Sequence, residues 1–186
     1  MVSANALALV VRKLLDSGFK FTVIGGTVVE LELGSRDLGD DVDLFAESPD
    51  LLVEEDAYRE FAEREGWSVG QTWLGTPRII ARVETEEVPI EFYDNLYDFY
   101  VPKSMLDRAR RVNIGGVRVK LVHVEDHIVL KANAGRDKDL ERLRELANLY
   151  RRGKLKLDLD SIREAAKEFE DEAVILRRLR DSGFPL

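Results

Sequence analysis

A strand-like segment that runs directly into two glycines constrains this chain more than any other feature. Residues 21–24 are largely β-branched, Gly25 and Gly26 follow them, and residues 27–33 have the apolar pattern of a short helix. A strand that enters a helix through glycines leaves backbone N–H groups free at the positive end of the helix, and such a helix N-terminus can bind phosphate. The alternative is a plain turn, with Thr27 as a helix cap rather than a phosphate ligand.

Two aspartates follow on an alternating segment, Asp41-Val42-Asp43-Leu44. On a strand, residues i and i+2 share a face, so both carboxylates project to one side. Adjacent carboxylates repel each other unless a cation lies between them, and hard oxygen ligands favour Mg²⁺ or Mn²⁺. The pair therefore predicts a divalent-metal site beside the phosphate seat, as a nucleoside triphosphate would need. The alternatives are an acidic, solvated edge strand and an EF-hand calcium loop, whose required glycine and closing glutamate are missing.

Together these residues resemble the motif of the DNA polymerase β-type nucleotidyltransferase superfamily. The motif is an apolar residue, Gly, then Gly or Ser, a spacer, and Asp-apolar-(Asp or Glu)-apolar, and residues 24–26 and 41–44 fill it. The spacer, residues 27–40, is slightly longer than usual. Arg36 and the later segment 125–131 are most similar to the small stand-alone nucleotidyltransferases, which include the toxins of abortive-infection toxin–antitoxin systems.

The resemblance also implies functions for individual residues. Asp41, Asp43 and a third carboxylate on a neighbouring strand would be catalytic metal ligands. Glu91 is the candidate for the third carboxylate, because it lies on the polar side of an alternating strand-like segment, residues 88–93. It would bind metal and act as general base for the attacking hydroxyl; the alternative is a solvent-facing glutamate on a hairpin. Without a phosphate to bind, Arg36 would be a solvated loop arginine. The implied nucleotide-binding residues are Gly25, Gly26, Thr27, Arg36 and Lys131, with Lys138 and Asp139 as secondary candidates.

The resemblance and the hydrophobic pattern together predict the fold class as α/β (α+β), with a nucleotidyltransferase-like mixed β-sheet core, helices packed on it, and an α-helical C-terminal portion. The core covers residues 1–122 and the helical portion residues 123–186, either as two domains or as one continuous domain. Apolar periodicity with glycine and proline boundaries predicts the individual elements. Helices are expected at 3–17, 50–65, 124–134, 140–150 and 157–180, strands at 67–73, 78–83 and 88–93, and a hairpin turn at 113–117.

Composition narrows the range of functions. The 186 residues include no cysteine, which excludes disulfides, thiolate zinc sites and cysteine nucleophiles. The two histidines, His123 and His127, are too few for a histidine-rich metal site, and we expect them to be structural or on the surface. No apolar run is long enough to cross a membrane and no signal pattern begins the chain, so the expected location is the cytoplasm. A charged fraction of 34%, rich in arginine, is typical of thermophiles.

Charge is unevenly distributed along the chain. The net charge of −8 argues against indiscriminate binding to nucleic acid. Residues 103–120 are nevertheless basic, because six lysines and arginines there are offset by one aspartate. RNA or the phosphates of a nucleotide would bind along this stretch, unless it is a solvated face. The aromatic residues Tyr97, Phe99 and Tyr100 just before it either stack on a base or pack within the protein.

The predicted function is that of an enzyme, a metal-dependent nucleotidyltransferase. An acceptor hydroxyl, or another nucleophile, would attack the α-phosphate of an NTP, so that NMP is transferred and pyrophosphate released, with Mg²⁺ or Mn²⁺ stabilising the charge. The acceptor is unknown and is RNA, protein or a small molecule. Three alternatives stay open: a nucleotide-binding or toxin–antitoxin-type interaction protein without turnover, a purely structural module, and a phosphohydrolase using the same carboxylates. The C-terminal helices would cover the substrate cleft or form a homodimer or antitoxin surface.

Overall fold

The structure, a computed structural model, describes all residues from 1 to 186, and the chain divides into two compact units. The first unit contains residues 1–96 and 109–122, and the second contains residues 97–108 and 123–186. The segment 97–108, which the sequence analysis assigned to the core, therefore groups with the C-terminal helices.

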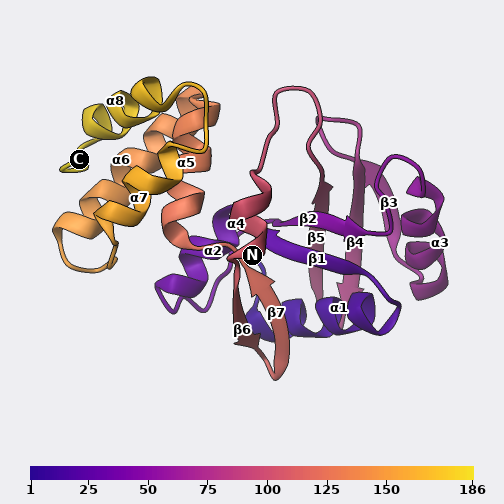
Figure 1. The fold of residues 1–186 in the computed structure, drawn as a ribbon. Helices are drawn as coiled ribbons and strands as arrows, with labels where there is room; N and C mark the ends of the chain where they lie inside the picture. Colours follow the sequence, from indigo (N-terminus) through magenta and orange to yellow (C-terminus); the bar gives the residue numbers. More distant parts are fainter. The chain divides into compact units, whose positions relative to one another are not determined.

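A seven-stranded mixed sheet forms the centre of the first unit (Figure 1). The strands are β1 (Lys20–Ile24), β2 (Val42–Ser48), β3 (Ser68–Gln71), β4 (Pro77–Val83), β5 (Glu86–Tyr93), β6 (Arg110–Ile114) and β7 (Val117–Leu121). Their order is β3-β4-β5-β2-β1-β7-β6. The β2–β5 and β1–β7 pairs are parallel and the remaining pairs are antiparallel. This mixed sheet with packed helices confirms the predicted fold class.

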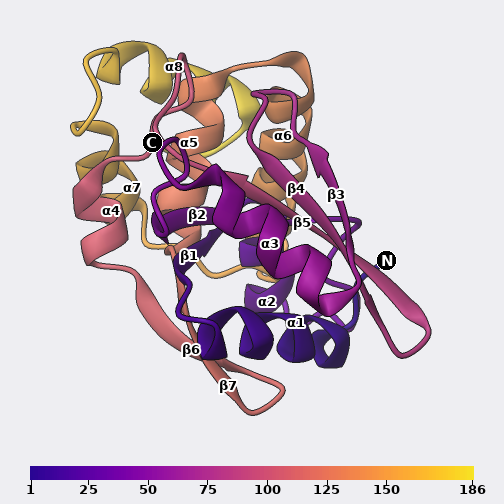
Figure 2. The same ribbon diagram turned by 90° about the vertical axis from the view of Figure 1, so that its right-hand side faces the viewer.

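One face of the sheet is apolar because β2 and β5 alternate. Val42 and Leu44 on β2, and Ile90 and Phe92 on β5, are each at most 1% exposed. The helices of this unit are α1 (Ala4–Asp16), α2 (Gly26–Glu32) and α3 (Glu55–Glu65). Helices α1 and α3 both contact β4 (Figure 2). The ring of Tyr58, on α3, lies 4.8 Å from the ring of Phe92, so α3 covers the apolar face and leaves the other face to polar side chains.

Local hydrogen bonds explain two differences from the predicted elements. The helix expected at 50–65 begins only at Glu55, because the Asp50 carboxylate accepts hydrogen bonds from the N–H groups of Leu52 and Val53 and forms a separate turn. The strand expected at 67–73 is shorter and ends at Gln71. There the hydroxyls of Thr72 and Thr76 bond to each other at 2.7 Å and close the turn into β4.

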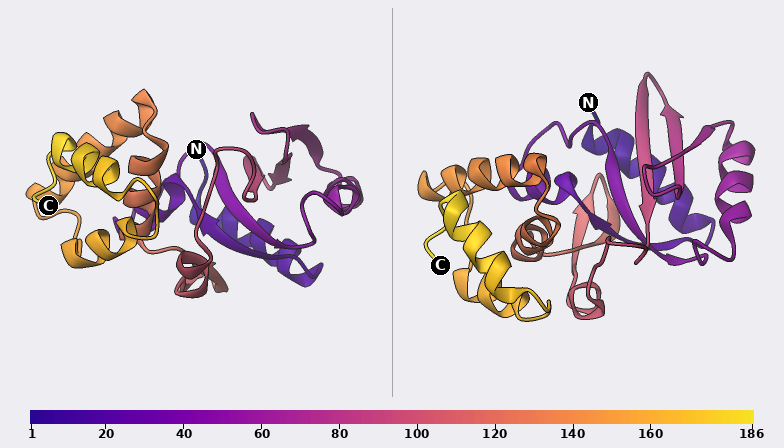
Figure 3. Two further views of the ribbon diagram at one scale, coloured as in Figure 1. Left: turned by 45° about the horizontal axis from the view of Figure 1, so that its top comes forward. Right: turned by 90° about the horizontal axis from the view of Figure 1, so that it is seen from above.

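The second unit is helical (Figure 3). Its helices are α4 (Lys103–Asp107), α5 (Val124–Ala134), α6 (Asp137–Arg151), α7 (Leu159–Ala166) and α8 (Glu172–Ser182). Helix α5 contacts α6, α7 and α8, and so forms the centre of the unit. None of these helices, nor any in the first unit, has the length and apolar character needed to cross a membrane.

Two predictions about the second unit were wrong. The single helix expected at 157–180 is broken into α7 and α8. After α7, the N–H groups of Glu168 and Phe169 donate hydrogen bonds to carbonyls three residues earlier, as in a 3₁₀ turn, and the α-helix ends there. The Phe169 ring then packs edge-on against Tyr100. The short helix α4 lies in the basic stretch 103–120, where no helix was expected.

Candidate functional site

The polar face of the sheet carries a row of charged side chains across three adjacent strands. Asp43 on β2 pairs in register with Glu91 on β5, and Glu91 pairs in register with Arg78 on β4. Residues in register on neighbouring strands share a face, so the three side chains follow one another across the sheet. The sequence prediction that Asp43 and Glu91 lie on neighbouring strands agrees with this pairing.

Gly25 lies directly against the Asp43 carboxylate. β1 is antiparallel to β2, and Ile24 is in register with Asp43, so the glycine turn follows β1 beside the aspartate. A Cβ atom added at Gly25 would come within 1.9 Å of Oδ2 of Asp43. Gly25 also has φ of +71° and ψ of −158°, a backbone conformation that is essentially restricted to glycine. The first glycine of the pair is therefore required by its contact with the aspartate as well as by the turn.

The carboxylate of Glu91 is engaged at both oxygens. The hydroxyl of Tyr93, two residues along the same strand, donates to Oε2 at 2.5 Å. Nε of Arg78 lies 3.2 Å from Oε1. The Glu91 side chain is only 13% exposed, so its charge is offset by the Arg78 guanidinium and stabilised by the hydroxyl of Tyr93.

The hydroxyl of Tyr93 lies within the field of all three predicted carboxylates. Burial raises the pKa of Tyr93 most, followed by its hydrogen bond to Glu91 and by the negative charges of Asp43, Glu91 and Asp41. Asp41 itself is exposed and lies just before β2 begins at Val42. The phenol therefore stays protonated, and the three negative charges are close enough to act on one atom.

The donor types fit a hard divalent cation, because carboxylate oxygens are the ligands that Mg²⁺ and Mn²⁺ prefer. Asp43 and Glu91 offer them side by side from adjacent strands. The side chains as placed nevertheless include no group of three or more His, Asp or Glu that could hold a metal ion. The three predicted carboxylates do not form such a group here, and Glu91 is in contact with Arg78 and Tyr93.

The predicted phosphate ligands of the first unit have different environments. The Thr27 hydroxyl is buried and donates to the carbonyl of Leu38 at 3.3 Å. The Thr27 side chain therefore secures the loop before β2 and makes no capping hydrogen bond to α2, so the capping alternative is wrong. A contact between Thr27 and phosphate stays a prediction. Gly26 is exposed at the start of α2, and Arg36 is exposed in the loop that follows α2.

The predicted residues of the second unit form their own ion-pair cluster. Asp139 is 1% exposed, and its oxygens accept from Nζ of Lys131 at 2.9 Å and Nε of Arg136 at 2.6 Å. Burial raises the pKa of Asp139, but the hydrogen bonds from Arg136 and Lys131 outweigh it and lower the pKa below its usual value. Lys138 is exposed and has no contact with this cluster among the described interactions. Asp139 thus stabilises α5 against α6 and is not an exposed ligand.

Both histidines have structural environments. His127 is buried, and burial together with the charges of Lys131 and Arg142 lowers its pKa to about 3, so the imidazole is neutral at physiological pH. Nε2 of His123 lies 3.0 Å from the carbonyl of Arg108.

The basic stretch 103–120 is divided between the two units, and most of its cations are paired with acids. The pairs are Lys103–Asp107, Arg108–Asp126, Arg108–Glu168, Arg110–Glu32 and Lys120–Glu47. Arg111 and Arg118 remain outside these pairs, so the local charge available to a nucleic acid is smaller than the sequence suggested. Of the preceding aromatic residues, Tyr100 packs on Phe169, whereas Tyr97 is 88% exposed.

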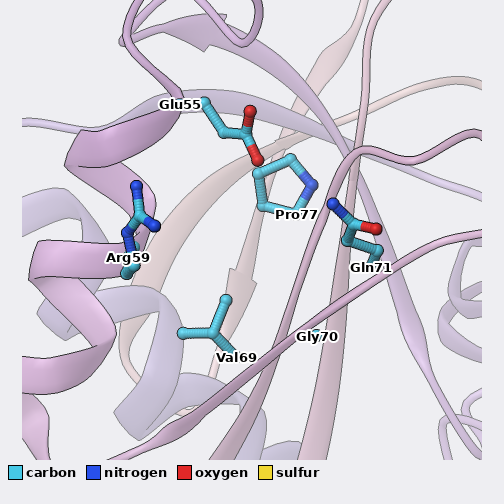
Figure 4. Close-up of a pocket in the computed structure, with 6 residues that line it drawn as sticks. All are labelled: Glu55, Arg59, Val69, Gly70, Gln71 and Pro77. Carbon is cyan, nitrogen blue, oxygen red and sulfur yellow. The ribbon is translucent and has the colours of Figure 1, made fainter.

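A cavity of about 250 Å³ lies elsewhere in the first unit (Figure 4). Glu55 and Arg59 of α3 line one side of it, and Val69, Gln71 and Pro77 line the other. Val69 pairs with Ile79, which is on the apolar face of the sheet, so this cavity opens on the side that α3 covers. It is separated by the sheet from Asp43 and Glu91 and does not belong to the charged row.

Sequence reasoning missed Arg78 and Tyr93. The spacing of Tyr93 two residues after Glu91 was a signal that the two share a strand face. Arg78 had no such signal, because its position opposite Glu91 depends on the register between two strands.

Comparison with known proteins points to one family. A family model described as "Nucleotidyl transferase of unknown function (DUF2204)" matches residues 3–181 of the chain. The crystal structure of an antigenic nucleotidyltransferase-like protein from Paracoccidioides brasiliensis is similar at a TM-score of 0.54 and 17% identity, covering 96% of this chain and 86% of that chain. The structure of ANT(2")-Ia in complex with adenylyl-2"-tobramycin has a TM-score of 0.48 and 17% identity, covering 94% of this chain and 97% of that chain. A comparison with curated proteins gave no match.

Proposed function

The chain belongs to the DUF2204 family of nucleotidyl transferases, and from that membership we propose that it transfers NMP from an NTP to an acceptor with release of pyrophosphate. The observation that carries the proposal is the pairing of Asp43 with Glu91 beside Gly25. The Asp43 carboxylate lies against the glycine turn, and Glu91 is in register with Asp43 on the neighbouring strand, which supports the proposed site.

We assign the residues of this site as follows. Asp43 and Glu91, with Asp41 at the start of β2, would hold Mg²⁺ or Mn²⁺ through their carboxylate oxygens. Such an ion supplies electrostatic stabilisation of the charge that develops on the transferred phosphoryl group. For Glu91 we propose the role of metal ligand, with Oε2 accepting from the Tyr93 hydroxyl and Oε1 lying 3.2 Å from Nε of Arg78. Its role as general base stays a prediction from the resemblance.

The phosphates of the NTP would be bound by the backbone of Gly25 and Gly26 and by Arg36. For Thr27 the backbone N–H is the remaining donor, since its hydroxyl is bonded to Leu38. The triphosphate contact of Lys131 stays a prediction from the resemblance, as do the roles of Lys138 and Asp139 and a toxin–antitoxin or homodimer partner.

The experiment that tests this function follows the fate of the α-phosphate. The protein is incubated with Mg²⁺ or Mn²⁺ and each of the four NTPs labelled at the α-phosphate, in the presence of total RNA, total protein or a small-molecule extract. We expect pyrophosphate release together with transfer of label to one acceptor class. Release of free labelled NMP without an acceptor product would indicate the phosphohydrolase instead, and no consumption of any NTP under these conditions would contradict both activities.

A further inference from the structure

The two carboxylate oxygens of Glu91 have different kinds of partner, Tyr93 at Oε2 and Arg78 at Oε1. Tyr93 is a neutral donor from the same strand, and its ring is 6% exposed, so its position is fixed by packing. Arg78 is a cation from the neighbouring strand, and its side chain is 39% exposed. One partner is therefore held rigidly, and the other reaches solvent.

Arg78 contacts Glu91 as an ion pair without a well-aligned hydrogen bond from its Nε. Its Nε is buried and 3.2 Å from Oε1 of Glu91, yet it has no hydrogen-bond partner of acceptable geometry. A buried donor without a well-aligned acceptor forgoes part of the stabilisation that a hydrogen bond supplies. The pair can therefore separate at a smaller cost than a well-aligned pair of the same length.

The charges of these partners have opposite consequences for a metal ion. A neutral hydroxyl can keep donating to a carboxylate that also binds a divalent cation, and such outer contacts orient metal ligands. A guanidinium on the same carboxylate repels that cation across a partly buried space, where charge interactions are poorly screened. Arg78 and a metal ion therefore compete for Glu91, whereas Tyr93 and a metal ion do not.

We propose that Tyr93 and Arg78 are positioning residues for Glu91 that act in opposite directions. Tyr93 aims the carboxylate across the strands toward Asp43. Arg78 neutralises the same carboxylate in the metal-free protein and is displaced when Mg²⁺ or Mn²⁺ binds. This inference rests on the proposed function, because it requires Glu91 to be a metal ligand.

The test measures binding of Mn²⁺ alone, without nucleotide, by titration with electron paramagnetic resonance of the free ion. Relative to the wild type, Tyr93→Phe is expected to weaken Mn²⁺ binding about tenfold, as loss of an orienting contact does. Arg78→Gln is expected to tighten binding by about the same factor, because it frees one oxygen of Glu91 and removes a positive charge. Arg78→Lys keeps the charge and is expected to stay within about threefold of the wild type.

Two matched variants control for general effects on the fold. Arg82 and Glu87 form a second ion pair between β4 and β5, at 3.0 Å. Arg82 lies four residues after Arg78 and Glu87 four residues before Glu91, so Arg82→Gln removes a cation from the same pair of strands away from Asp43. Tyr58 is another buried tyrosine, whose hydroxyl donates to the carbonyl of Pro49, so Tyr58→Phe removes an equivalent hydroxyl. Neither variant is expected to change Mn²⁺ affinity.

The outcomes separate this inference from the proposed function. If the wild type does not bind Mn²⁺, or if Asp43→Asn binds it as tightly as the wild type, the proposed metal site itself is wrong. If the wild type binds Mn²⁺ in this way but Arg78→Gln weakens binding or leaves it unchanged, the competition is contradicted. Unchanged affinity in Tyr93→Phe would likewise overturn the positioning role of the phenol.

Discussion

Replacing Asp43 by asparagine is expected to lower the rate of NMP transfer at least about 10³-fold while leaving the fold intact, since loss of even an outer contact to a metal ligand costs about 10–100-fold. Asparagine keeps the shape of the side chain and removes its charge. Asp43 is half-buried on β2, in register with Glu91, so no neighbouring acid can take its place without moving a strand. Pyrophosphate release and transfer of the α-phosphate label measure the effect.

Asp40→Asn is the matched control for this loss. Asp40 lies three residues earlier in the same acidic loop, and its side chain is 99% exposed with a single contact to the N-terminal amine at 3.4 Å. Asp40→Asn removes one negative charge, as Asp43→Asn does, but at a residue that is not part of the proposed site. We expect near-normal transfer from Asp40→Asn, and equal losses in the two variants would show that the acidic loop acts as a whole.

The second large effect is expected from Gly25→Ala. The new Cβ would lie 1.9 Å from Oδ2 of Asp43, and the residue would have to keep a φ of +71°. Strain of this kind costs about 1–3 kcal/mol before the collision is counted, so we expect the free energy of unfolding to fall by about 3 kcal/mol. Denaturant unfolding measures this change. Because the aspartate must move to relieve the contact, transfer activity should fall as well.

The neighbouring glycine provides a direct comparison. A Cβ at Gly26 would meet nothing within 4 Å, and Gly26 lies in α2 without a positive φ. Gly26→Ala should therefore leave stability unchanged or raise it slightly, since alanine favours a helix. Equal destabilisation by the two substitutions would contradict the claim that contact with Asp43 is what requires glycine at position 25.

The parts of the site that follow from local spacing could be predicted from the sequence. The strand, the two glycines and the alternating aspartate pair are close in the sequence, and β1 and β2 are adjacent antiparallel strands joined by one short helix. The positions of these residues relative to one another therefore follow from local spacing. Glu91 could be placed only through the resemblance. β2 and β5 pair in parallel although two strands intervene in the sequence, and no local pattern shows that pairing.

The rest depends on contacts between distant residues. Arg78 reaches Glu91 through the β4–β5 register, and Thr27 turns its hydroxyl inward to the carbonyl of Leu38. The basic stretch appeared available for binding because its acidic partners, such as Glu32 and Glu47, lie more than seventy residues away in the chain. The ion pair between Lys131 and Asp139 joins two successive helices, and the sequence alone did not show that these two side chains meet.

Thermal denaturation in the presence of nucleotide tests the central claim most directly. The wild type and Asp43→Asn are heated with each of the four NTPs, with and without Mg²⁺ or Mn²⁺. At a concentration about 100 times the Kd, binding adds about 2.7 kcal/mol and is expected to raise the wild-type Tm by about 5–10 °C. We expect a rise in Tm that needs the metal ion, favours one base and is lost in Asp43→Asn. No rise for any nucleotide, or an equal rise in the variant, would contradict the claim.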